Sequence, residues 1–174
     1  MKKLLIAALC TSAFTLTACD KKATESTDKK EAATATAAAN LSSNNAADIK
    51  ADLAAIEAWT AKQATEATEF QAKITEATQK SGQNSLKEAF EIMKSQNEKS
   101  VKDLDALTIK STEVDALRSK MKESANIGLE MAEAAMSTQP DAKKISELTT
   151  KATEVTKAMA EDLKTLQAKA AEAK

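Results

Sequence analysis

Residues 46–80 read AADIKADLAAIEAWTAKQATEATEFQAKITEATQK, and this stretch decides the fold class. Apolar or small residues recur in it at alternating intervals of four and three, the heptad spacing of a helix that packs on other helices. Asn44 or Asn45 is suited to cap the start of this helix, and Ser81-Gly82 is suited to end it. The predicted seam consists of Ile49, Leu53, Ile56, Thr60, Gln63, Ala67, Phe70, Ile74 and Ala77.

Polar and aromatic side chains mark the middle of this helix. Thr60 and Gln63 interrupt the seam. They are either a tolerated polar layer that sets the register of the packed helices or a polar contact point for a ligand. Trp59, the only Trp, lies beside the seam. We expect its ring to pack within the bundle, whereas an exposed ring would indicate a contact with a partner protein.

Three further amphipathic segments follow. The second helix is predicted from Ser85, where Ser85-Leu86-Lys87-Glu88 forms a capping box. β-branched and hydroxyl residues weaken the helix over residues 107–111, so we predict a break there, with Ser111 or Thr112 capping the third helix. Pro140 suits the first position of the fourth helix. The predicted seams are Leu86, Phe90, Met93, Asn97, Val101 and Leu104, then Val114, Leu117, Met121, Ser124, Gly128, Met131 and Ala135, then Ile145, Leu148, Ala152, Val155, Met159, Leu163, Leu166 and Ala170.

These segments predict an all-α fold, an antiparallel up-and-down bundle of four long amphipathic helices. A three-helix bundle is the alternative, if the chain does not reverse at residues 107–111. The composition favours helices, because the chain has two Gly, one Pro and no Tyr. Many seam positions are Ala, Thr or Ser, so we expect a thin core. Gly128 costs about 1 kcal/mol relative to Ala in a helix, and we expect it to allow close helix contact.

Residues 1–18 are predicted to form an export signal. Two lysines precede a short apolar run over residues 4–9, and this run is too short and too broken to span a bilayer. Leu16-Thr17-Ala18-Cys19 follows and resembles the bacterial lipobox. The resemblance implies cleavage between Ala18 and Cys19, diacylglycerol on the Cys19 thiol, and an acyl chain such as palmitate on its amino group. More than one lipid chain gives stable anchoring. The alternative is a plain secretory signal, or an uncleaved anchor, with a chance cysteine.

Cleavage would leave about 155 residues with Cys19 as the only cysteine, because Cys10 lies in the signal. Residues 19–45 are then a lipidated Cys and a flexible tether, since they contain almost no large apolar side chains. The helical bundle is assigned to residues 46–174. Asp20 next to Lys21 resembles a sorting signal that keeps a lipoprotein in the inner membrane, but bacterial lineages differ in how they use these positions. Inner and outer membrane therefore both remain open.

Groups for catalysis are scarce in the sequence. The chain has no His, which excludes Ser–His and Cys–His catalysis and most zinc sites. It also has no Gly-rich phosphate loop. The carboxylate pairs Glu66/Glu69 and Glu130/Glu133 are expected to be solvated. Lys and Arg number 25 and Asp and Glu 26, so no basic excess favours nucleic acid. We predict no catalytic residue, no metal, no cofactor and no enzymatic activity.

The sequence predicts a non-enzymatic envelope lipoprotein, anchored through Cys19 with its domain in the periplasm, whose bundle binds or scaffolds another envelope component. One alternative is a structural spacer or self-associating coiled coil that touches peptidoglycan, and another is a carrier of a small ligand or lipid. The lipidated N-terminus, the Ala/Lys-rich heptads and Lys174 resemble Braun's lipoprotein, whose terminal Lys is linked to peptidoglycan. That family is a single short helix ending in Tyr-Arg-Lys, whereas this chain ends in Glu172-Ala173-Lys174, so covalent attachment is not expected.

Overall fold

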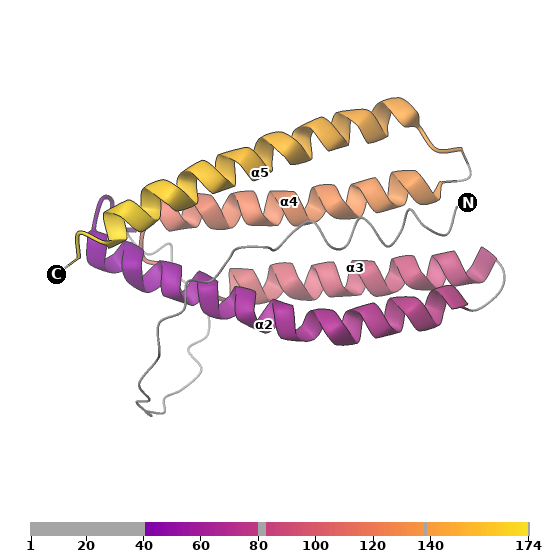
Figure 1. Cartoon of the computed structure of the whole chain (residues 1–174), viewed down its shortest axis with the longest axis horizontal. Helices are drawn as coiled ribbons and strands as arrows, with labels where there is room; N and C mark the ends of the chain where they lie inside the picture. Colours follow the sequence, from indigo (N-terminus) through magenta and orange to yellow (C-terminus); the bar gives the residue numbers. More distant parts are fainter. Residues whose placement is uncertain (1–40, 80–82, 138, 174) are drawn as a thin grey trace. The chain divides into compact units, whose positions relative to one another are not determined.

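The computed structural model describes residues 41–79, 83–137 and 139–173, all of which belong to one compact unit. These residues form four helices and no strand, namely α2 (Ala46–Gln79), α3 (Gln83–Asp105), α4 (Thr112–Met136) and α5 (Ala142–Ala170). Figure 1 shows α2–α3 and α4–α5 as two hairpins of antiparallel helices. The chain reverses between α3 and α4. The predicted four-helix bundle is therefore confirmed, and the three-helix alternative is wrong.

The helix ends follow local side-chain chemistry. Asn45 caps α2, because its side-chain oxygen accepts hydrogen bonds from two backbone N–H groups of the first turn, at 3.1 and 3.3 Å. Asp141 caps α5 in the same way at 2.9 and 3.0 Å. Pro140 precedes this cap, so the prediction that it occupies the first helical position is wrong. Because α3 begins at Gln83, Ser85 lies inside the first turn and does not start the helix as predicted.

A buried carboxylate fixes the connection between α3 and α4. Asp52 of α2 is only 2% exposed. It accepts hydrogen bonds from the N–H of Lys110 at 3.0 Å, the N–H of Ser111 at 2.7 Å and the Ser111 hydroxyl at 2.6 Å. Three donors to one charged acceptor replace the water that burial removes. Ser111 occupies the N-cap position of α4 as predicted, but its hydroxyl serves Asp52 instead of the helix end.

Residues 41–45 pair with the same connection and are called the strap below. The N–H of Ser42 donates to the carbonyl oxygen of Lys110 at 2.7 Å, and the N–H of Thr112 donates to the carbonyl oxygen of Ser42 at 2.9 Å. These two bonds form an isolated parallel bridge between Ser42 and Ser111. The strap, which lies within the predicted tether of residues 19–45, is therefore hydrogen-bonded to the bundle.

The apolar side chains form one large cluster at one end of the bundle. We call this end the proximal half. Here α2 and α4 begin and α3 and α5 end (Figure 1). All four helices contribute to its core, as does the connection between α3 and α4. The members of this proximal core are Ile49, Leu53, Ile56, Trp59, Leu104, Ile109, Val114, Leu117, Met121 and Leu166.

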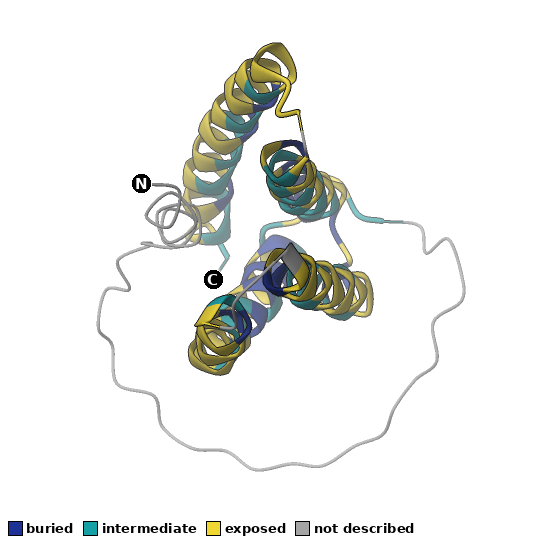
Figure 2. Ribbon diagram, turned by 90° about the vertical axis from the view of Figure 1, so that its right-hand side faces the viewer, coloured by how far each residue is buried: buried dark blue, intermediate teal, exposed yellow. Residues whose placement is uncertain are grey.

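The distal half, which carries the α2–α3 and α4–α5 connections, has two small clusters instead. Each lies within one hairpin, and among the described residues no buried cluster joins the two hairpins there. Figure 2 accordingly shows helices that are largely exposed, with narrow buried or half-buried stripes. The α2–α3 cluster contains Ile74, Ala77 and Ala89, and the α4–α5 cluster contains Ile127, Ala134, Leu148 and Val155.

The predicted seams are therefore covered only in part. Ala67 of α2 and Gly128 and Ala135 of α4 are exposed, although the heptad spacing places them in line with buried residues. A Cβ added at Gly128 would meet no atom within 4 Å. The expectation that Gly128 allows close helix contact is wrong, because no neighbouring element lies against it.

Candidate functional site

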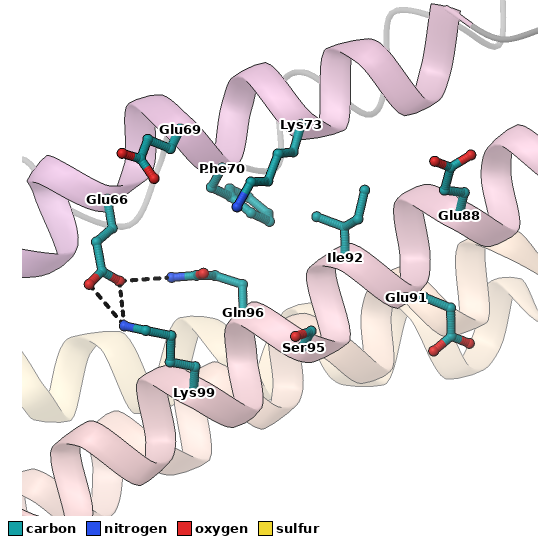
Figure 3. Close-up of a pocket in the computed structure, with 10 residues that line it drawn as sticks. All are labelled: Glu66, Glu69, Phe70, Lys73, Glu88, Glu91, Ile92, Ser95, Gln96 and Lys99. Carbon is teal, nitrogen blue, oxygen red and sulfur yellow. Dashed lines mark hydrogen bonds and ion pairs between the residues drawn. The ribbon is translucent and has the colours of Figure 1, made fainter.

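An open groove runs along the distal half of the α2–α3 hairpin and has a volume of about 540 Å³. Figure 3 shows its lining side chains, which come from one face of each helix. On α2 they recur at intervals of three and four residues, which places them on one side of the helix, and the same holds on α3. The lining residues are Glu66, Glu69, Phe70 and Lys73 of α2 and Glu88, Glu91, Ile92, Ser95, Gln96 and Lys99 of α3.

The groove has an apolar floor. Phe70 and Ile92 face each other across the two helices (Figure 3), and both are half-buried against the α2–α3 cluster. The rim is charged, and its carboxylates outnumber its lysines by four to two. Among the rim charges, Glu69, Glu91 and Lys73 form no ion pair with a described residue. The floor can bury apolar side chains of a ligand, and the free rim charges can form ion pairs with it.

An ion-pair network closes the proximal end of the groove. The Lys99 ammonium contacts Glu66 at 2.7 Å and Asp103 at 3.0 Å, and the Lys62 ammonium contacts Asp103 at 2.8 Å. The hydrogen bond from Lys99 lowers the pKa of Glu66, and the one from Lys62 is the main cause of the lowered pKa of Asp103. The hydrogen bond to Glu66 in turn raises the pKa of Lys99. Glu66, Lys99 and Asp103 stay charged at neutral pH, and the ion pairs of the network hold α2 against α3.

The groups of the groove are suited to binding. They are carboxylates, ammonium groups, one amide and one hydroxyl, without His or Cys. Among the described residues, no group of three or more His, Cys, Asp or Glu is placed to hold a metal ion. A second, smaller hollow of about 250 Å³ lies at the α4–α5 connection, lined by Glu133, Ala134, Ser137, Gln139, Asp141 and Lys144.

Of the residues singled out from the sequence, Glu66, Glu69 and Phe70 line the groove, whereas Trp59 does not. Ala18, Cys19, Asp20 and Lys21 lie outside the described residues. Trp59 is 7% exposed and belongs to the proximal core, so the exposed ring that would indicate a partner contact is not found. Its Nε1 has no hydrogen-bond partner among the described residues.

The two polar seam residues differ in how they are satisfied. The Thr60 hydroxyl donates to the carbonyl oxygen of Ile56 at 2.9 Å, so α2 itself satisfies it. Gln63 is half-buried, and its Nε2 has no hydrogen-bond partner among the described residues. The sequence alone does not reveal the groove, because it predicts a solvated face at Glu66 and Glu69 and a seam position at Phe70. The signal for the groove is the second row of charged residues, which lies beside Ile92 on α3 as Glu66 and Glu69 lie beside Phe70 on α2.

The comparison with known proteins identifies the family. The family described as Uncharacterised lipoprotein PM1805 matches residues 50–172, which include nearly all of the four helices. The chain belongs to this family. Because the match covers the bundle and not the lipobox, it supports the predicted bacterial lipoprotein independently of the signal segment. No curated protein and no solved structure matches the chain. Among the described residues, no helix is long and apolar enough to cross a membrane.

Proposed function

We propose that this lipoprotein is a non-enzymatic binding protein of the bacterial envelope. Its Cys19 carries the lipid anchor, its bundle lies in the periplasm, and the α2–α3 groove binds a polypeptide segment of another envelope component. The observation that carries the proposal is the composition of the groove, a half-buried apolar floor beneath a rim with more carboxylates than lysines.

The groove favours a particular kind of segment. Phe70 and Ile92 offer apolar surface that a partner's aliphatic or aromatic side chains would remove from water. Glu69 and Glu91 favour a Lys or Arg beside those side chains, and this attraction would also speed the encounter at low salt. We therefore expect an amphipathic segment, apolar on one side and basic on its flank, held in the way helices bind in grooves.

Lipid anchoring supports a binding role in a second way. Confinement to one membrane surface raises the effective concentration of the bundle for any partner held at the same surface. A modest affinity in solution is then enough for stable association. A modest affinity is what we expect of this groove, because it is open along its length and would contact a bound segment on one side only.

Site-specific cross-linking in cells tests the proposal. A photoreactive amino acid replaces Ser95, an exposed groove residue, in the full lipidated chain. We expect one discrete adduct with an envelope protein. The same residue placed at Lys157, which is exposed on α5, should give no adduct. Glu69→Lys and Glu91→Lys, both at exposed positions, should lower the adduct yield from Ser95 without unfolding the bundle. The absence of any adduct at Ser95, or equal adducts at both positions, would refute a binding role for the groove.

The anchor is tested separately. Cys19→Ala should leave an unlipidated precursor, because the thiol that receives the lipid is gone. The measurement is the mass of the N-terminal peptide together with membrane fractionation. A variant that matures normally and stays at the membrane without its acyl chains would show that Cys19 is not the anchor.

A further inference from the structure

A second surface lies where α3 and α4 run side by side in the distal half, away from the groove. Four large apolar side chains there belong to none of the three buried clusters, namely Leu86 and Phe90 of α3 and Leu129 and Met136 of α4. Leu86 is 42% exposed, and the other three are half-buried.

Helical spacing shows which side of each helix carries these residues. Leu86, Phe90 and Asn97 of α3 lie on one face, and Asn97 donates to Asn126 of α4 at 3.4 Å. Leu129 and Met136 continue the face of α4 that carries Asn126. The four apolar residues therefore continue the faces that carry the Asn97–Asn126 pair into the part of the bundle without a shared core.

The flanks of this surface carry opposite charges on the two helices. On α3, Lys87 and Lys94 lie beside the face that carries Leu86 and Phe90. On α4, Glu130 and Glu133 lie beside the face that carries Leu129 and Met136. None of these four side chains forms an ion pair or hydrogen bond with a described residue. In the proximal half, by contrast, α3 and α4 do form an ion pair, between Lys122 and Asp105 at 2.7 Å.

We infer that this surface pairs two copies of the lipoprotein, with α3 of each copy against α4 of the other. A two-fold axis brings the same patch of both copies together, so a patch that is basic on one helix and acidic on the other complements itself. Each contact then occurs twice, with the lysines of one copy facing the glutamates of the other. The exposed Leu86 is covered in both copies. This inference goes beyond the proposed function, which uses the opposite side of α3.

Thiol cross-linking of the full lipidated chain in membranes tests the pairing. The processed chain has no free cysteine if Cys19 is lipidated, so an introduced thiol reports only its own position. Cells express Lys94→Cys and Glu130→Cys on separate chains. Mild oxidation should link them into a species of twice the chain mass, at roughly fivefold the yield of either variant alone, because disulfides need Cα atoms within about 7 Å. The matched control replaces Glu130→Cys by Lys157→Cys on α5, and it should give no linked species.

Charge exchange and an apolar substitution sharpen the test. For this test the thiols are placed by Phe90→Cys on one chain and Leu129→Cys on the other. Adding Lys94→Glu to the first chain should lower the yield of linked species about threefold, and adding Glu130→Lys to the second chain should restore it. Leu86→Glu should abolish linkage while leaving the groove adduct from Ser95 unchanged, which separates this inference from the proposed function. The inference is overturned if the mixed variants give no linked species or give as much as the Lys157 control. It is also overturned if a chain with both cysteines forms only an internal disulfide.

Discussion

The proximal and distal halves of the bundle share one heptad pattern but are held together differently. In the proximal half, four helices and the α3–α4 connection surround ten buried apolar residues. The buried Asp52 carboxylate holds this connection by hydrogen bonds. In the distal half, each hairpin keeps a small core of its own, and the seam residues between the hairpins are exposed or half-buried. Continuous apolar periodicity thus does not guarantee a continuous core, because a seam is buried only where a neighbour lies against it.

A matched pair of isoleucines gives the largest test of this difference. Ile49 in the proximal core and Ile74 in the α2–α3 cluster are 0% and 4% exposed. Ile49→Ala should lower the free energy of unfolding by about 4 kcal/mol, since four helices around it cannot collapse into the cavity, whereas Ile74→Ala should cost about 2 kcal/mol. Urea denaturation measures both. Equal losses would show that the two halves have equally constrained cores.

Asp52 gives the next effect. Asp52→Ala leaves three donors of the α3–α4 connection without their acceptor, so we expect a loss of about 3 kcal/mol in the free energy of unfolding. The control, Glu57→Ala, removes an exposed carboxylate of the same helix and should change stability by less than about 0.5 kcal/mol. Similar results for the two variants would mean that the proximal half does not depend on this buried contact.

Gly128 tests the distal half in the opposite direction. Gly128→Ala should raise the free energy of unfolding by about 0.5–1 kcal/mol, because the added methyl group meets no neighbour and the helix gains propensity. Ala132→Gly, one turn further along α4, should lower it by a similar amount. Thermal unfolding measures both changes. A destabilised Gly128→Ala variant would show that another helix packs on Gly128 and that the distal half is closed in solution.

The smallest effect concerns pH and the strap. Burial raises the pKa of Glu113, but the hydrogen bond from the Asn44 N–H at 2.8 Å and further bonds, including one from Lys169, lower it more, so the pKa lies below its usual 4.5. A depressed carboxylate pKa stabilises the folded state at pH above the unfolded value, and this contribution is lost as pH falls through the folded value.

Protection of the Asn44 amide from hydrogen exchange should therefore decrease below about pH 4.5. Nuclear magnetic resonance measures it, and Glu113→Gln should remove this pH dependence. Exchange at Ile74 is the internal control, because Ile74 belongs to the distal α2–α3 cluster and not to the strap. Protection of Asn44 that does not change with pH would mean that Glu113 does not hold the strap.

Local features of the sequence were sufficient to predict the helices. Heptad spacing placed α2, α4 and α5 to within a few residues, and the β-branched residues of 107–111 predicted the reversal that separates four helices from three. The capping role of Asn45 also followed from residue type. The errors at Ser85 and Pro140 are shifts of the helix start by three and two residues, since several neighbours there are equally able to begin a helix.

The candidate site could be predicted only in part. The acidic pair Glu66/Glu69 was visible, but the groove exists because α3 brings Glu91 and Ile92 alongside, about 25 residues later. Asp52 was missed for the same reason, since its partners on the α3–α4 connection lie 58 and 59 positions away. A charged residue next to a heptad seam gives no local sign that distant donors will bury it.

By itself, the sequence predicted a lipoprotein signal at Cys19 and determined the helical character of the chain and most helix ends, because these depend on residues within a few positions of one another. The tertiary structure alone decided which parts of the seams are covered, that Trp59 is buried, and that an acidic groove lies between α2 and α3. The physical reason is that helix formation is local, whereas burial requires a second element within contact distance.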